Sequence, residues 1–167
     1  ELLQISDHIV FNSERQLRKY GQRCREAGIS VGLRLNPQCS TQGDHALYDP
    51  CAPGSRFGVT LDKIPSDLLE LVDGLHFHTL CEQGADDLET TLKAVEDQFG
   101  AYLHQVKWLN MGGGHHITRE DYDVDLLISE IKRIRKTYNL DVYIEPGEAI
   151  ALNAGDLATE VLDISEI

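Results

Sequence analysis

Residues 108–114 of the chain read WLNMGGG, an apolar strand that runs directly into three glycines. A helix is predicted beyond it, because apolar side chains recur at three- and four-residue spacings at Leu127, Ile131 and Ile134. Another apolar strand follows this helix at residues 141–145. A strand, a helix and a strand in this order are typical of parallel strands joined by a crossover helix. The stretch therefore predicts an α/β fold.

The same alternation extends toward the N-terminus. Strands are predicted at residues 8–11, 31–35 and 74–78. Helices are predicted over residues 13–28, 66–72 and 88–99. In the first of these helices, Ser13 and Gln16 have the spacing of a capping box, and Gly28 is placed to end the helix. The weak alternation of residues 157–164 favours one more strand.

Two architectures fit repeated strand–helix units, a doubly wound sheet and a (β/α) barrel. In both, chemistry gathers at the carboxyl ends of the strands. Polar or glycine residues follow separate predicted strands there, namely Arg34, His78, the run Gly112–Gly114 and Glu145. We expect these four elements to meet at one edge of the sheet. Residues 37–58 form a long predicted loop; with the helix near residues 66–72, it is a candidate for shaping a substrate pocket.

Composition excludes several classes of protein. The chain is 41% hydrophobic and 26% charged, which is ordinary for a globular protein. Residues 1–36 carry a balance of +2, whereas residues 37–167 carry −15. This acidic balance argues against nucleic acid as a partner and suits a small cation such as a polyamine. No apolar run approaches the roughly 18–20 residues that a membrane span needs, so no membrane partner is expected.

The cysteines indicate a reducing compartment. Cys24, Cys39, Cys51 and Cys81 include no CxxC pair, which argues against a zinc ribbon or a redox motif. No signal peptide opens the sequence. We therefore expect reduced thiols in a cytoplasmic protein.

The glycine run and the two charged residues each allow two interpretations. Three successive N–H groups without side chains can approach a phosphate closely, but a glycine run can also be only a flexible turn. Glu145 needs a cationic or N–H partner, and a structural salt bridge to Arg34 is as plausible as a catalytic role. Arg34 faces inward if Leu33 and Leu35 pack on helices, as an anion ligand or a counter-ion.

The two histidines of the predicted strand at 74–78 also leave alternatives open. His76 and His78 point to the same face of the strand. Such a pair could ligate zinc, with His115, His116 or Glu145 completing the site. It could instead supply a flat imidazole that stacks on a ring, or be an ordinary core residue.

Together these segments resemble the pyridoxal-phosphate (PLP) decarboxylases of fold type III, the alanine racemase and ornithine decarboxylase group. GGG followed about 30 residues later by EPG is the signature shared across the group. HFHTLCE (76–82) and EPGEAI (145–150) point to the carboxynorspermidine (carboxyspermidine) decarboxylase branch. The remaining matching segments are FNSERQL (11–17), GLRLNP (32–37), SRFGV (55–59), QFGAYL (98–103) and MGGG (111–114).

The resemblance implies a role for each candidate residue. His78 matches the histidine that stacks on the pyridine ring of PLP, and Glu145 matches the carboxylate that bonds the pyridine nitrogen; these two are the implied catalytic residues. Arg34 matches an arginine near the cofactor. The loop that holds the cofactor phosphate is matched by Gly112, Gly113 and Gly114. No metal ligand is implied.

Two features depart from the family pattern. Ornithine and diaminopimelate decarboxylases carry EPGR, whose arginine helps to bind the phosphate, whereas Glu148 occupies that position here. We hypothesise that Glu148 faces the cationic end of the substrate. The family also anchors the cofactor covalently through a lysine on an early strand. None of the lysines is predicted at a carboxyl end of a strand; they are Lys19, Lys63, Lys93, Lys107, Lys132 and Lys136.

The length of the chain indicates how much of a barrel it can form. A (β/α)8 barrel needs about 250 residues, whereas this chain has 167, begins with Glu1 and has Met111 as its only methionine. We expect residues 1–155 to form about five strands of a PLP-binding barrel that lacks its first strands. Residues 156–167 would begin the connection to a C-terminal β-domain, absent here. The longer enzyme would be a homodimer, and the chain alone would be inactive.

The expected function is decarboxylation of carboxynorspermidine or carboxyspermidine to norspermidine or spermidine in polyamine biosynthesis. Three alternatives remain open. They are a diaminopimelate or ornithine decarboxylase-like PLP enzyme, a metal-dependent barrel hydrolase that uses His76, His78 and Glu145, and a non-catalytic regulator built on a decarboxylase fold.

Overall fold

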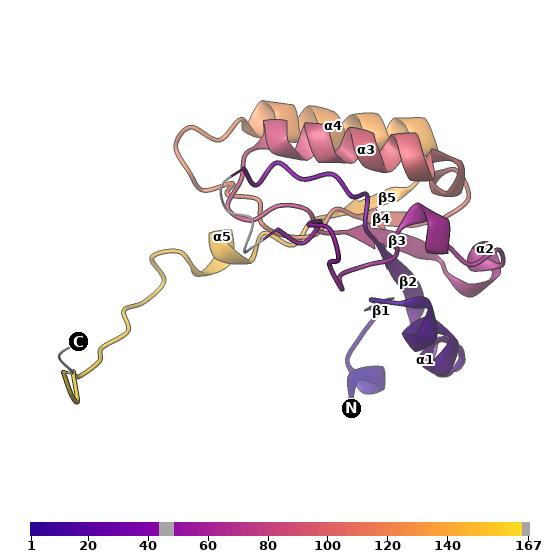
Figure 1. Ribbon diagram of the computed structural model, residues 1–167, viewed down its shortest axis with the longest axis horizontal. Helices are drawn as coiled ribbons and strands as arrows, with labels where there is room; N and C mark the ends of the chain where they lie inside the picture. The colour runs from indigo at the N-terminus through magenta and orange to yellow at the C-terminus, as the bar shows by residue number, and fades with distance from the viewer. Residues whose placement is uncertain (44–48, 165–167) are drawn as a thin grey trace.

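The computed structural model describes residues 1–43 and 49–164. It contains one sheet of five parallel strands, whose spatial order β1-β2-β3-β4-β5 follows the chain. The strands are β1 (His8–Phe11), β2 (Ser30–Leu35), β3 (Gly74–Phe77), β4 (Trp108–Asn110) and β5 (Asp141–Tyr143). All five were predicted. A doubly wound sheet reverses its strand order at a switch point, so the uninterrupted order identifies the alternative architecture, an arc of a (β/α) barrel (Figure 1).

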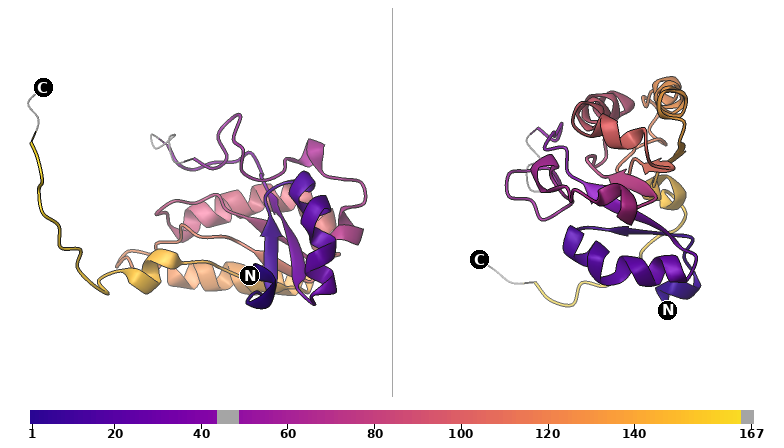
Figure 2. Two further views of the ribbon diagram at one scale, coloured as in Figure 1. Left: turned by 90° about the horizontal axis from the view of Figure 1, so that it is seen from below. Right: turned by 90° about the vertical axis from the view of Figure 1, so that its right-hand side faces the viewer.

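Helices connect the strands on one side of this arc. The long ones are α1 (Glu14–Glu26), α3 (Ala85–Leu103) and α4 (Val124–Tyr138), and the short ones are α2 (Leu68–Leu71) and α5 (Gly147–Ala151). Two 3-10 turns span Leu2–Gln4 and Leu61–Lys63. In Figures 1 and 2, α1 lies at the β1 end of the curved sheet, while α3 and α4 lie side by side near β4 and β5. Among the described residues, no helix is both long and apolar enough to cross a membrane.

The two faces of the sheet have different residues. Leu33, Leu75 and Leu109 are register partners on neighbouring strands and are completely buried toward the helices. One position earlier, on the opposite face, the partners are Gly32, Gly74 and Trp108. A Cβ at Gly74 would lie 1.9 Å from the Trp108 ring, and one at Gly32 would lie 2.3 Å from it. The two strand glycines therefore make room for Trp108 on the inner face.

The predicted capping of the first long helix is confirmed only in part. The Ser13 hydroxyl accepts from the Gln16 amide, and Gly28 lies just past the helix with φ of +79°. Gln16 Oε1, however, accepts from the Asn12 amide rather than from the Ser13 amide. The predicted reciprocal capping box is thus wrong in its second half, because the Gln16 side chain reaches one residue further back.

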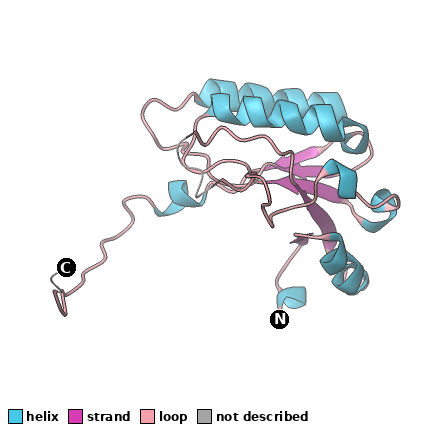
Figure 3. Ribbon diagram, in the orientation of Figure 1, coloured by secondary structure: helices cyan, strands magenta, loops and turns pink. Residues whose placement is uncertain are grey.

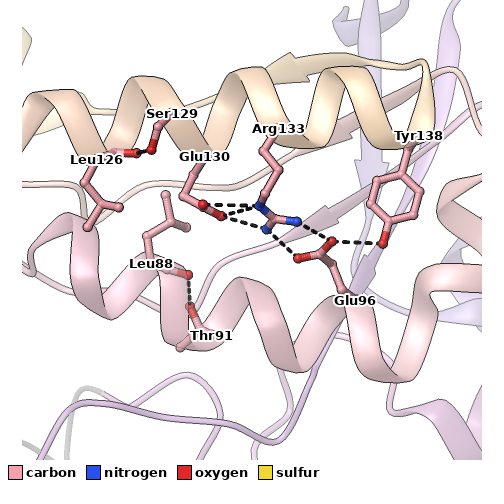
Figure 4. A network of polar contacts seen from close by, with 8 residues as sticks. All are labelled: Leu88, Thr91, Glu96, Leu126, Ser129, Glu130, Arg133 and Tyr138. Atoms are coloured by element: carbon pink, nitrogen blue, oxygen red, sulfur yellow. Dashed lines mark hydrogen bonds and ion pairs between the residues drawn. The ribbon is translucent and has the colours of Figure 1, made fainter.

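The two helices beside β4 and β5 are joined by a polar network (Figure 4). Arg133 of α4 donates to both carboxylate oxygens of Glu96 on α3, at 2.8 and 2.6 Å. It also donates to Glu130 on its own helix, and the Tyr138 hydroxyl donates to Glu96 at 2.9 Å. The contacts fix the relative position of α3 and α4.

The C-terminal part of the chain differs from the prediction. Residues 157–164 form neither strand nor helix, and Figure 3 draws them as loop that leads away from the sheet. Leu157 and Leu162 are each 89% exposed. The predicted strand is wrong because a weak alternation specifies a strand only where one face can be buried, and no described residue covers either face here. Residues 165–167 of the predicted connection lie outside the described part.

The predicted loop at 37–58 contains no helix or strand in its described parts, 37–43 and 49–58, while residues 44–48 lie outside them. Several side chains tie it to the sheet edge. Asn12 Nδ2 donates to the carbonyl of Arg56, and its Oδ1 accepts from the amide of Gly58. Gln83 Nε2 donates to the Thr41 carbonyl and hydroxyl. The described loop thus lies against the ends of β1 and β3.

Candidate functional site

The predicted polar residues surround one cavity at the carboxyl ends of the strands. This cavity measures about 270 Å³. It is lined by Val10 of β1 and by Asn12 just after that strand, from β2 by Arg34, from β3 and its end by His76 and His78, and beyond β5 by Glu145. The alternation of side chains places Arg34 on this inner face, because Leu33 and Leu35 are buried on the helix side. Of the predicted site residues, the structure brings Arg34, His78 and Glu145 to this cavity.

Glu145 is held by two neighbours on its inner side. Its Oε1 accepts from Asn110 Nδ2 at 2.8 Å, and its Oε2 lies 3.8 Å from His76 Nε2. The pKa of Glu145 is about 2, because His76 and Asn110 stabilise the carboxylate more than partial burial destabilises it. The carboxylate is therefore ionised at neutral pH. Among the described residues its partner is not Arg34, so the salt bridge considered from the sequence is not formed.

His78 is fixed by the glycine loop. The Gly113 amide donates to its Nδ1 at 3.2 Å. Burial lowers the pKa of His78, and the nearby Arg34 and His76 lower it further. A neutral imidazole that accepts at Nδ1 carries its proton on Nε2. His78 therefore presents a flat neutral ring with an N–H donor at Nε2.

Arg34 is held between the end of β3 and the loop. Its Nη2 is 3.4 Å from the carbonyl oxygen of His78, and its guanidinium lies 4.7 Å from the centre of the Phe57 ring. Burial lowers the pKa of Arg34, but arginine remains charged at physiological pH. Arg34 thus places a positive charge at the cavity that no described carboxylate neutralises by an ion pair.

The glycine run packs closely on the chain that leaves β3. Gly112 and Gly114 have φ of +71° and +80°. A Cβ would lie 2.4 Å from the Phe77 oxygen at Gly112 and 2.2 Å from the Leu80 oxygen at Gly114. The run is therefore required by the backbone and is not simply a flexible turn.

The amides of this loop are partly engaged, which the sequence did not indicate. The Gly112 amide donates to Asn110 Oδ1 at 2.8 Å, and the Gly113 amide donates to His78. The Gly114 amide has no acceptor among residues 1–43 and 49–164. The expected cradle of three free N–H groups is therefore reduced to one, unless the two bonds are exchanged for a ligand.

The two histidines that follow the glycines do not line the cavity. His116 Nε2 is 3.0 Å from Glu148 Oε1. His115 is 1% exposed, and neither of its ring nitrogens has a hydrogen-bond partner among the described residues. Ligand atoms of His76, His78 and Glu145 lie within 4.8 Å of one another, so among the described residues this is the set that could hold a metal ion.

Sequence reasoning assigned no role to Asn110, and it left His76 open as a metal ligand, a stacking ring or an ordinary core residue. Both residues are register partners on β3 and β4 and face the cavity side. The signal was present in the sequence. Asn110 lies between Leu109 and Met111, which are buried on the other face, so alternation alone places its side chain inward.

Lysines are placed as predicted, away from the cavity. Lys107 pairs with Asp73 at 2.7 Å, just before β4 begins and so at the opposite edge of the sheet. Four others lie on helices, namely Lys19, Lys93, Lys132 and Lys136, and Lys63 ends a 3-10 turn. None of the six lines the cavity.

Comparison with known proteins shows that the chain is similar in sequence to decarboxylases. No family model matches it. A carboxynorspermidine/carboxyspermidine decarboxylase of Campylobacter jejuni is 43% identical over 99% of the chain, and a carboxyaminopropylagmatine decarboxylase of Synechocystis is 39% identical over 99%. The chain spans 43% of the length of each. It therefore covers less than half of these relatives.

Solved structures agree with the sequence comparison. The crystal structure of the Campylobacter jejuni carboxynorspermidine decarboxylase complexed with norspermidine matches 99% of this chain and 42% of that one, with a TM-score of 0.82 and 40% identity. A diaminopimelate decarboxylase matches 84% of the chain with a TM-score of 0.56 and 17% identity, which shows the shared fold alone.

The fold is thus a segment of the barrel found in the PLP-dependent decarboxylases of fold type III. Within that group, the chain is related to the carboxynorspermidine decarboxylases over almost its whole length.

Proposed function

We propose that the protein carrying this chain decarboxylates carboxynorspermidine or carboxyspermidine with PLP, giving norspermidine or spermidine. The similarity to the Campylobacter jejuni enzyme carries this proposal, because 43% identity extends over 99% of the chain and includes every element that lines the cavity. The solved relative is a complex with norspermidine, a product of the proposed reaction.

The residues at the cavity fit the cofactor. Ionised Glu145 is suited to hold a proton on the pyridine nitrogen, since a carboxylate beside it favours the charged ring. The flat, neutral His78 is suited to stack on the ring face. The glycine loop and Arg34 offer the groups for the phosphate end, with the Gly114 amide as the free donor. When bound, PLP supplies an electron sink for the electron pair left as CO2 departs.

Each residue then has one task at a stated atom. Glu145 keeps the positive charge at the ring nitrogen, where electron density arrives in the transition state. The Gly113 amide fixes the plane of His78 through Nδ1, which leaves the ring face free to cover the cofactor. Gly112 and Gly114 allow the loop to approach the end of β3 closely. These tasks are orienting and electrostatic, and the bond-breaking chemistry belongs to the cofactor.

Charge supports a cationic substrate. Residues 37–167 carry a balance of −15, and such a field attracts a polyamine. Glu148 remains our candidate for the cationic end of the substrate, although its carboxylate is paired with His116. Glu148→Gln should raise KM for carboxynorspermidine and leave kcat nearly unchanged. An unchanged KM would exclude this role.

The proposal extends to the cellular location and the oligomeric state of the protein. We place it in the cytoplasm as a homodimer, the arrangement implied by the family resemblance. All four cysteines are free thiols. Burial, with the nearby Asp49, raises the pKa of Cys51 to about 12, so this thiol is protonated and unreactive.

A metal site is the second candidate function, and the grouping of His76, His78 and Glu145 favours it. Zinc would need a lone pair on each histidine. The Gly113 amide occupies Nδ1 of His78 and so places the ring proton on Nε2. His78 would have to surrender this hydrogen bond to bind zinc, and the cofactor proposal requires no such change.

One experiment separates these candidates. The gene product that carries this chain is expressed at its full encoded length and assayed on carboxynorspermidine, carboxyspermidine and diaminopimelate, with PLP or with zinc. We expect PLP-dependent release of CO2 from the two carboxylated polyamines. Preference for diaminopimelate would overturn the substrate class, and zinc-dependent hydrolysis without PLP would overturn the cofactor.

A further inference from the structure

Glu145 lies at the end of a row of side chains on the inner face of the sheet. Few contacts hold its own side chain in place. Its amide donates to the Gly112 carbonyl at 2.8 Å, which fixes the backbone. Its side chain is 52% exposed. Beyond the backbone, only Asn110 and His76 hold the carboxylate among the described residues, one at each oxygen. The orientation of the carboxylate therefore depends on two side chains.

These two side chains come from adjacent strands at the same level. His76 of β3 and Asn110 of β4 are register partners. Asn110 is itself fixed, because its Oδ1 accepts from the Gly112 amide at 2.8 Å while its Nδ2 donates to Glu145. His76 is only 7% exposed, so its ring has little freedom to turn away. His76 and Asn110 therefore contact the Glu145 carboxylate from fixed positions.

Packing alone does not account for a histidine at position 76. Its Nδ1 is buried and has no hydrogen-bond partner among residues 1–43 and 49–164. A buried polar atom left unpaired is unfavourable, and a leucine would avoid that cost. The polar contact that remains to the ring is the one from Nε2 to Glu145. The imidazole is thus explained by the carboxylate that it faces.

We propose that His76 is a positioning residue that, together with Asn110, holds the Glu145 carboxylate in the orientation that the cofactor ring nitrogen requires. His76 does not itself contact the cofactor in this role. The inference rests on the proposed function, since it takes the ring nitrogen as the partner of Glu145. It adds a specific consequence: loss of His76 weakens only those interactions that pass through that nitrogen.

The test compares two cofactors on the gene product at its full encoded length. One is PLP, and the other is its analogue in which a CH group replaces the pyridine nitrogen. We expect His76→Leu to raise the dissociation constant for PLP about tenfold and to leave that for the analogue unchanged. The absorbance band of the ring-protonated cofactor should weaken in parallel. His76→Gln, which keeps an N–H group facing Glu145, should recover most of the PLP affinity.

A matched control is available on the same face of the sheet. His8 is also a strand histidine, but it packs on the rings of Trp108 and Tyr143, each at 5.2 Å between ring centres. His8→Leu should leave both dissociation constants unchanged. If His76→Leu does not fold, as judged by circular dichroism, His76→Ala takes its place, with the same expected loss of PLP affinity and an unchanged affinity for the analogue.

Two outcomes would overturn the inference. One is equal weakening of PLP and its analogue in His76→Leu, which would indicate a general structural role. The other is unchanged binding of both. Wild-type protein that binds neither cofactor would instead overturn the proposed function, so the two failures are distinguishable.

Discussion

Gly112 is a position of the loop at which a single added methyl group should be strongly destabilising. Its φ is +71°, and a Cβ would lie 2.4 Å from the carbonyl oxygen of Phe77. Gly112→Ala should therefore reduce the free energy of unfolding by about 3 kcal/mol, from backbone strain and overpacking together. Gly28→Ala is the control, because Gly28 has a similar φ of +79° but nothing within 4 Å. It should cost about 1 kcal/mol. Equal losses in urea unfolding would contradict the close packing.

One buried histidine, His115, and one partly buried histidine, His78, make the protein sensitive to mild acid. Burial lowers the pKa of both His78 and His115 below the ordinary value of 6.5. As the pH falls below 6.5, the unfolded chain therefore binds protons before the folded chain does. The free energy of unfolding decreases as a result. Carboxylates with lowered pKa values, such as Glu145, contribute to this loss only below about pH 4.5. We expect a lower urea-unfolding midpoint at pH 5.5 than at pH 7.5.

His115 offers the check on this pH dependence. His115→Leu removes one of the two titrating rings and leaves no described hydrogen bond unmade. Its unfolding midpoint should change less between pH 7.5 and 5.5 than that of the wild type. The same or a steeper change in the variant would show that the acid sensitivity has another source.

At the residue scale, positions were predictable from the sequence and partners were not. Alternation along the strands placed Arg34 and His78 on the inner face, as the structure has them. The partner of Glu145 depends on which strands adjoin and in what register, so Asn110 and His76 were missed in that role. The pairing of Glu148 with His116 likewise depends on how α5 lies relative to the loop that follows β4.

The polar network between α3 and α4 allows the energetic contribution of a contact between two elements to be tested. The side chains of Glu96 and Glu130 are only 15% and 9% exposed, and Arg133 serves both. Arg133→Leu removes the cationic partner of two largely buried carboxylates and leaves Glu96 only its hydrogen bond from Tyr138. We expect a loss of about 2 kcal/mol, less than for a fully buried pair because Arg133 itself is 42% exposed.

The control for this network is an exposed arginine of the same kind. Arg18 of α1 bonds both Glu14 and Asp67, but all three side chains are well exposed. Arg18→Leu should change the thermal midpoint much less than Arg133→Leu, since exposed pairs contribute little. A larger shift for Arg18→Leu would contradict this ranking.

Elements were predictable where a periodic pattern met a buried face. All five strands and the three long helices follow such patterns, since their apolar positions form the core. The tail at 157–164 and α5 show the limit of this reasoning. The tail has an alternating pattern but no described surface to cover it, and α5 is a single five-residue turn whose apolar Ile150 is 82% exposed.

At the scale of the whole molecule, the strand order needed the structure. Sequence reasoning left the doubly wound sheet and the barrel open, because both consist of repeated strand–helix units. The uninterrupted strand order from β1 to β5 decided between them. The boundary at residue 155 stays a prediction, as does the expected β-domain connection.

The 167-residue chain by itself should not turn over substrate. None of its lysines lines the cavity, so the chain offers no amine to anchor the cofactor there. With added PLP, we expect no CO2 release from carboxynorspermidine above the level given by free PLP. The gene product at its full encoded length is the positive control. Turnover by the 167-residue chain would refute this prediction.

The central claim is that Glu145, His78 and the glycine loop form part of a PLP site for decarboxylating a carboxylated polyamine. The most direct measurement is norspermidine formation from carboxynorspermidine by the gene product at its full encoded length, with and without PLP, beside Glu145→Gln. We predict PLP-dependent formation of norspermidine that falls at least a hundredfold in Glu145→Gln. Norspermidine formation that is independent of PLP, or undiminished in Glu145→Gln, would contradict the claim.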